Sequence, residues 1–133
     1  MHRVFLALGA LLGAIAVGLG AFAAHGLKKV ASVEALSVFQ TGVQYEMYHS
    51  LALLAVGIVF RRLPTTMVTA AGCLFAAGVL FFSGSLYLIT FFTVRHVAVP
   101  AAVGIVTPIG GLLFILGWLA LFFGVMKRNS QGY

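Results

Sequence analysis

The feature that most constrains this chain is its first apolar run, Val4 to Ala24, which has 21 residues and no charged side chain. A helix needs about 20 such residues to cross the hydrocarbon core of a bilayer. The composition extends this argument to all 133 residues, because 62% of them are hydrophobic and only 8% are charged. An ordinary globular domain has about 25% charged residues. A soluble fold is therefore excluded, and an integral membrane protein is predicted.

The first run also allows a second interpretation, a secretory signal peptide. Arg3 would supply a short basic region, and Ala21-Phe22-Ala23 resembles a cleavage site. However, the apolar core of a signal is only about 7–15 residues long. Gly9 and Gly13 also have the G-x-x-x-G spacing at which membrane helices approach closely. We therefore expect this run to remain in the protein as the first span, residues 4–24.

Three further spans are predicted, at residues 40–60, 67–89 and 109–126. The second belongs to a longer helix that begins after the N-cap Ser32 and ends at Arg61-Arg62, because no proline interrupts it. For the fourth span, Thr107 is the expected N-cap and Pro108 the first helical residue. The apolar stretch 97–106 is too short to span and is predicted to be an interfacial or re-entrant segment. The predicted fold class is all-α, an integral membrane four-helix bundle in a single domain.

The basic residues lie at the ends of the apolar runs, where they anchor and orient membrane helices. Four spans place the N-terminus, the turn after the second span and the C-terminus on one side of the membrane. That side holds five basic residues and the other side holds three: Arg3, Arg61, Arg62, Lys127 and Arg128 against Lys28, Lys29 and Arg95. This bias predicts cytoplasmic termini. DNA-binding proteins gather their basic residues on one stripe, so no nucleic-acid partner is expected.

Small residues recur at heptad spacing along the third and fourth spans, and Ser85 continues the series on the third. Helices in a bilayer associate largely through close packing over small residues. The predicted packing positions are Gly9, Gly13, Ala71, Gly78, Gly110, Gly117 and Gly124. These positions, in a chain with almost no mass outside the membrane, predict a structural or accessory protein that packs with itself or with a larger membrane complex.

The most informative polar residue is Glu46, because an ionisable group inside a span costs about 2.5–3.5 kcal/mol and normally has a partner in the bundle interior. His49 lies three residues further on, on the same side of the helix. A rise of 1.5 Å per residue brings polar residues of the third span to the same depth, and Trp118 could donate its indole N–H near His49. The predicted intramembrane polar site comprises Gln44, Tyr45, Glu46, Tyr48, His49, Ser83, Ser85, Tyr87 and Trp118.

Two interpretations of this polar site stay open at this point: a buried Glu46–His49 pair that fixes helix packing, or a site that binds a small molecule or lipid. Proton conduction would need a continuous polar path, and the other half of the bundle is nearly pure hydrocarbon. Haem between His25 and His49 is not expected, because the two residues differ in depth by about 12 Å. No activated nucleophile or metal-ligand set is visible. We therefore expect no enzyme activity, no cofactor and no metal site.

Four motifs occur in order along the chain: Gly20-Ala-Phe-Ala-Ala-His-Gly26, Thr41-Gly-Val-Gln-Tyr-Glu-Met-Tyr-His49, Phe82-Ser-Gly-Ser-Leu-Tyr87, and Thr107-Pro-Ile-Gly-Gly111 with Gly117-Trp118. In these motifs the chain resembles the domain-of-unknown-function 423 family, whose members are small four-span proteins of the bacterial inner membrane, with a relative in transmembrane protein 256 of animals. The resemblance covers nearly the whole chain, although Ala23-Ala24-His25 stands where family members often have Gly-Ala-His. It implies a four-helix inner-membrane protein that keeps its first span, and it implies no reaction.

Overall fold

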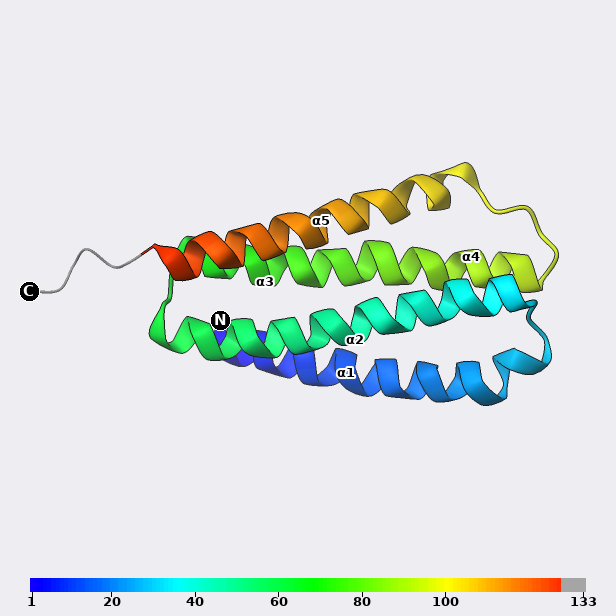
Figure 1. Cartoon of the computed structure of the whole chain (residues 1–133), viewed down its shortest axis with the longest axis horizontal. Coiled ribbons are helices and arrows are strands. Elements are labelled where there is room, and N and C mark those ends of the chain that lie inside the picture. Colours follow the sequence, from blue (N-terminus) through cyan, green and yellow to red (C-terminus); the bar gives the residue numbers. More distant parts are fainter. Residues whose placement is uncertain (128–133) are drawn as a thin grey trace, which may run out of the picture.

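Long helices account for most of residues 1–127, which are the part of the chain that the computed structural model describes (Figure 1). The helices are α1 (His2–His25), α2 (Val33–Arg62), α3 (Thr66–Gly78), α4 (Gly84–Val94) and α5 (Ala101–Met126). A π-helical turn, Val79–Ser83, joins α3 to α4, so that Thr66–Val94 forms one continuous helix. Four helices are thus long and apolar enough to cross a membrane, and no strand occurs within residues 1–127. The predicted all-α four-helix membrane bundle is confirmed.

The second helix begins where the sequence predicted. The hydroxyl of Ser32 accepts a hydrogen bond from the Ala35 N–H at 3.1 Å and so caps α2. Glu34 lies in the first turn, where a negative charge is favourable. The helix ends at Arg62. Its 30 residues exceed the predicted membrane portion, 40–60, by about two turns at the N-terminal end.

The start of the fourth membrane helix differs from the prediction. α5 begins at Ala101, directly after Pro100, so Thr107 is not an N-cap and Pro108 lies inside the helix. A separate interfacial or re-entrant segment over 97–106 is therefore wrong, because residues 101–106 are the first turns of α5. Lipid offers the backbone no hydrogen-bond partners, so an apolar stretch continues the helix, and membrane helices tolerate an internal proline.

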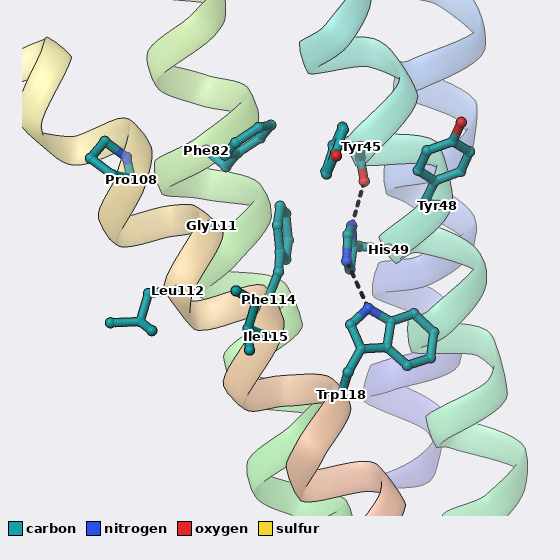
Figure 2. Close-up of a pocket in the computed structure, with 10 residues that line it drawn as sticks. All are labelled: Tyr45, Tyr48, His49, Phe82, Pro108, Gly111, Leu112, Phe114, Ile115 and Trp118. Atoms are coloured by element: carbon teal, nitrogen blue, oxygen red, sulfur yellow. Dashed lines mark hydrogen bonds between the residues drawn. The ribbon is translucent and has the colours of Figure 1, made fainter.

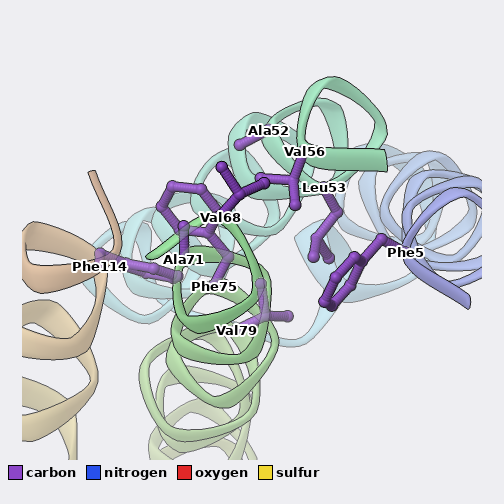
Figure 3. Close-up of a cluster of buried hydrophobic side chains, with 9 residues drawn as sticks. All are labelled: Phe5, Ala52, Leu53, Val56, Val68, Ala71, Phe75, Val79 and Phe114. Atoms are coloured by element: carbon purple, nitrogen blue, oxygen red, sulfur yellow. The ribbon is translucent and has the colours of Figure 1, made fainter. Parts of the chain in front are cut away.

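The helices are arranged with α1 and α5 on the outside and with α2 and the α3–α4 helix between them (Figures 1 and 3). α1 packs on α2, α2 packs on α3 and α4, and α3 packs on α5. Fully buried apolar side chains, among them Leu53 and Val56 of α2 and Val68 and Phe75 of α3, form the central core. The N-terminus and the end of α5 lie at one end of the bundle, which we call the termini end. The α1–α2 and α4–α5 loops lie at the opposite loop end.

The contact between α5 and the α3–α4 helix includes predicted packing residues of both helices. The faces of Gly110, Gly117 and Gly124 lie against Phe82, Phe75 and Val68, so both helices repeat every seven residues. Gly78 contacts Phe114 between these positions, and Ala71 is fully buried. Two antiparallel helices with the same repeat stay in register along their whole length. This register aligns the polar residues of α4 with those of α5.

The contact between α1 and α2 also depends on small residues. Gly9 lies against the Ser50 carbonyl, and Gly13 lies against the Ser50 hydroxyl. Gly57 of α2 receives the side chain of Leu6 in the same way. Gly9 and Gly13, predicted as packing positions, thus lie at this contact together with Gly57, which was not among the predicted positions.

Candidate functional site

Glu46 is buried on α2, with 3% of its surface exposed, and its partner is on α4. The hydroxyl of Tyr87 donates a hydrogen bond to Oε2 of Glu46. The Tyr87 ring lies against Gly42, one turn earlier on α2, where any side chain would occupy the space of the ring. Glycine at this position therefore allows the ring to reach Glu46. The equal depth of Glu46 and Tyr87, inferred from helical rise alone, holds in the structure.

His49 is buried as well, with 4% exposed, and it contacts α5 (Figure 2). Its Nδ1 lies 2.7 Å from the Tyr45 carbonyl oxygen, and its Nε2 accepts a hydrogen bond from the Trp118 indole at 3.2 Å. A carbonyl can only accept and an indole N–H can only donate, so the imidazole is neutral with its proton on Nδ1. Both ring nitrogens are used, and a metal or haem iron at His49 would have to displace Trp118.

Aromatic rings hold the imidazole of His49 in one orientation. Its centroid lies 3.5 Å from that of Phe114, and the two planes differ by 6°. Phe75 and Trp118 pack near it at 5.4 and 6.0 Å, and the Tyr45 ring lies 6.1 Å away. Packing against these aromatic rings stabilises the same orientation of the imidazole that the two hydrogen bonds favour.

Glu46 and His49 do not form the mutually bonded pair that was one interpretation of the sequence. Residues three positions apart on a helix differ in direction by about 60°, so both can be buried against different neighbours. Glu46 borders a crevice beside α1 and α4, whereas His49 borders a groove beside α5. The structure therefore divides the predicted polar site into two sites.

The two buried serines of the third span also bond to different helices, Ser83 to α2 and Ser85 to α5. Ser83, the last residue of the π-helical turn, is fully buried and donates to the Gly42 carbonyl at 2.7 Å, so it joins the α3–α4 helix to α2. Ser85 bonds to the Phe82 carbonyl at 2.8 Å, and its hydroxyl lies 2.6 Å from that of Thr107 on α5. Ser85 thus joins α4 to α5. Thr107 had been assigned only as a helix cap, so its role as a partner was missed.

Gln44 lines neither hollow, and its assignment to the polar site is wrong, whereas Tyr48 lines the groove beside α5 together with His49. Tyr48 is 54% exposed and Gln44 is also exposed. Tyr45 is 38% exposed, and its ring packs at 4.7 Å from Phe82 along the groove beside α5. Four exposed residues that recur at helical spacing form what we call the polar face of α2: Ser37, Gln40, Gln44 and Tyr48. Gln44 and Tyr48 were predicted to belong to the polar site because they are polar residues inside a span. They are exposed because they lie on an exposed side of α2.

Two hollows on the membrane-facing surface follow from this arrangement. The α2–α5 groove has a volume of about 770 Å³ and is lined mainly by aromatic and aliphatic side chains (Figure 2). The α1–α4 crevice, about 320 Å³, is lined by Leu8, Leu12, Glu46, Ala76, Val79, Leu80, Gly84 and Tyr87. Ligand pockets commonly have volumes of about 300–1,000 Å³ and apolar walls with a few polar groups. Both hollows are in this range.

Comparison with known proteins decides the family. The family described as "Protein of unknown function (DUF423)" matches residues 19–111. This chain belongs to the DUF423 family. Its relatives include proteins named UPF0382 membrane protein: one from Staphylococcus saprophyticus is 46% identical over 125 residues, which are 94% of this chain and 98% of that protein. One from Bacillus subtilis is 42% identical (94% and 98% covered), and one from Haemophilus influenzae is 41% identical (98% and 99% covered). No solved structure matches.

The DUF423 match covers most of the polar site. It includes Glu46, Tyr87 and both serines that join helices, whereas Trp118 lies beyond its last matched residue. The names of the relatives confirm a membrane protein and give no reaction. Within residues 1–127, no group of three or more His, Cys, Asp or Glu side chains lies where it could hold a metal ion.

Proposed function

We propose that this DUF423 protein is a structural or accessory component of the bacterial inner membrane, which assembles with itself or with a larger membrane complex and catalyses no reaction. The observation that carries this proposal is the use of its buried polar groups. Within residues 1–127, no buried side-chain nitrogen or oxygen lacks a hydrogen-bond partner. Glu46, Ser83, Ser85 and His49 each have a hydrogen-bond partner on a neighbouring helix.

These hydrogen bonds stabilise the helix arrangement. Interhelical hydrogen bonds in membrane proteins contribute about 0.6 kcal/mol on average and about 1.7 kcal/mol at most. Glu46 and Ser83 tie α2 to the α3–α4 helix, His49 ties α2 to α5, and Ser85 ties α4 to α5. Reactive groups of an enzyme need access to a substrate, whereas each of these groups is hydrogen-bonded to a neighbouring helix. Their arrangement therefore favours a rigid bundle.

The polar face of α2 supports assembly with a further helix. Gln44 lies inside the predicted membrane portion, and its exposed amide has no hydrogen-bond partner among the described residues. Glutamine side chains in membranes typically bond across to neighbouring helices. A partner helix on this face would satisfy the amide, and Tyr48, one turn further along, would lie in the same contact.

The proposed orientation has both termini in the cytoplasm. In the structure the termini end holds Arg3, Arg61, Arg62 and Lys127, and the loop end holds Lys28, Lys29 and Arg95. Arg128, the fifth basic residue of the predicted cytoplasmic side, lies outside the described residues. An excess of Lys and Arg on the cytoplasmic side supports this orientation. A reporter enzyme that is active only in the cytoplasm, fused to the C-terminus, tests it.

Native mass spectrometry of the protein, extracted from its own membranes in a mild detergent, tests the proposed assembly. We expect a defined homo-oligomer or a stoichiometric complex with another membrane protein. Gln44→Leu should reduce the assembled fraction, because it removes the unpaired amide. Leu112→Val, at an exposed position of α5, should leave the assembly intact. A strictly monomeric particle without a partner would overturn the proposal.

A further inference from the structure

The α1–α4 crevice has a polar end and an apolar remainder. Glu46 and Tyr87 lie toward the loop end of the bundle, and the crevice continues from there toward the bilayer centre. Along the α3–α4 helix it extends from Gly84 to Ala76, which corresponds to about 12 Å of helix. Leu8 and Leu12 of α1 form the opposite wall. The polar end therefore lies on the loop-end side of the crevice, and apolar walls continue from it toward the termini end.

One oxygen of the Glu46 carboxyl group is available at this polar end. Tyr87 donates to Oε2, and Oε1 has no hydrogen-bond partner among the described residues. Because no fully buried side-chain oxygen in this part of the chain lacks a partner, Oε1 reaches the surface of the crevice. The carboxyl group is thus held in place by α4 and still has a free acceptor.

The crevice supplies no positive charge for this carboxyl group. None of the residues that line it is basic. Charged side chains inside a membrane normally pair with an opposite charge or with other polar groups. Tyr87 provides a hydrogen bond but no charge, and a cation bound at Oε1 would supply the opposite charge to a carboxylate.

We propose that the α1–α4 crevice binds an amphiphile with a primary ammonium head, which bonds to Glu46, and that one alkyl chain of this molecule lies along Leu12 and Leu8. An ammonium group carries three N–H donors and no acceptor, which matches a carboxylate oxygen. Glu46 lies at the end of the crevice nearer the loop end, so the head would lie on that side, and the apolar walls follow the direction of the helix axes. This inference is independent of the proposed assembly, because the polar face of α2 is not part of the crevice.

Binding of dodecylamine to the protein in phosphatidylcholine nanodiscs tests the inference, with dodecanol as the neutral probe of equal chain length. Native mass spectrometry counts the probe molecules that each protein chain retains. We expect one dodecylamine per wild-type chain and much weaker retention of dodecanol. Glu46→Gln should weaken dodecylamine binding by about tenfold or more, or about 1.4 kcal/mol, because a charge-assisted hydrogen bond is lost. Glutamine keeps an acceptor for Tyr87, so the helix contact is preserved.

A second pair of variants tests the apolar part of the crevice without changing Glu46. Ala76→Leu adds a side chain to the crevice wall and should block dodecylamine binding. Ala55→Leu, an identical substitution on the exposed side of α2, should leave binding unchanged. This pair carries the test if Glu46→Gln does not fold.

The results that would overturn the inference are equal binding of dodecylamine to wild type and Glu46→Gln, equal binding of dodecanol and dodecylamine, or full binding by Ala76→Leu. Nanodiscs that contain phosphatidylethanolamine identify the source of the ammonium group. Displacement of dodecylamine by this lipid supports binding of a lipid headgroup at Glu46. Unchanged dodecylamine binding supports a free amphiphile at the same site.

Discussion

Replacing Gly110 with alanine tests the close approach of α5 to the α3–α4 helix. A Cβ atom at Gly110 would overlap the backbone nitrogen of Phe82, which cannot move without displacing the helix. At the adjacent Gly111, a Cβ atom would lie 3.8 Å from Cδ2 of the Phe82 ring, an ordinary van der Waals contact. Gly111→Ala is therefore a matched control, with the same chemical change one residue away.

The expected effects follow from two opposing contributions. Alanine in place of glycine in a helix interior stabilises the fold by about 0.5–1 kcal/mol. Overpacking of a close contact destabilises it by about 1–3 kcal/mol. Gly111→Ala has only the first contribution and should raise the free energy of unfolding, whereas Gly110→Ala has both. The free energies of unfolding of the two variants should thus differ by about 1–3 kcal/mol, with Gly110→Ala the less stable.

Unfolding by sodium dodecyl sulfate in mixed micelles provides the assay. Trp118 is the only tryptophan, and its indole bonds to His49 across the α2–α5 contact, so its fluorescence reports the separation of α5. Equal free energies of unfolding for Gly110→Ala and Gly111→Ala would refute the argument, because the helices would then have room for a Cβ atom at both positions.

Two further predictions concern the hydrogen bonds between helices. Trp118→Phe removes the donor to His49 and should lower the free energy of unfolding by about 0.6–1.7 kcal/mol, measured by circular dichroism; an unchanged value would contradict the hydrogen bond. Ser85→Ala and Thr107→Val, separately and combined, should show a coupling energy of about 0.6 kcal/mol in a double-mutant cycle. Strictly additive losses would mean that the two hydroxyl groups do not interact.

The fourth helix begins at Ala101 and not at the predicted Pro108, for an identifiable reason. Pro100 and Pro108 both suit the beginning of a helix, and the apolar residues 101–106 between them fit either choice. In water a proline often interrupts a helix, but in lipid the backbone has no other partner, so the helix extends through Pro108 to Pro100. The earlier start also brings Thr107 into the helix, where it faces Ser85. Because the predicted helix began only after Thr107, Thr107 was not predicted as a partner of Ser85 in the polar site.

The division of the polar site had no signal in the sequence. Helical rise predicts that Glu46, Ser83, Ser85 and Tyr87 lie at similar depth, but it does not say which neighbour each side chain contacts. The π-helical turn Val79–Ser83 changes the direction of the residues that follow it, and Phe82 of this turn packs against Gly110 of α5. This contact between distant segments cannot be inferred from either segment alone.

The sequence by itself determined the class of protein, the number of spans and the glycine contacts of the bundle. It could do so because lipid requires helices that satisfy their own backbone, and because close helix packing requires small residues at regular spacing. Only the tertiary structure decided which groups bond to one another. It separated Glu46 from His49, exposed Gln44 and Tyr48, and left one carboxylate oxygen open to a crevice. These outcomes depend on the rotation of each helix about its axis, which is set by packing against its neighbours.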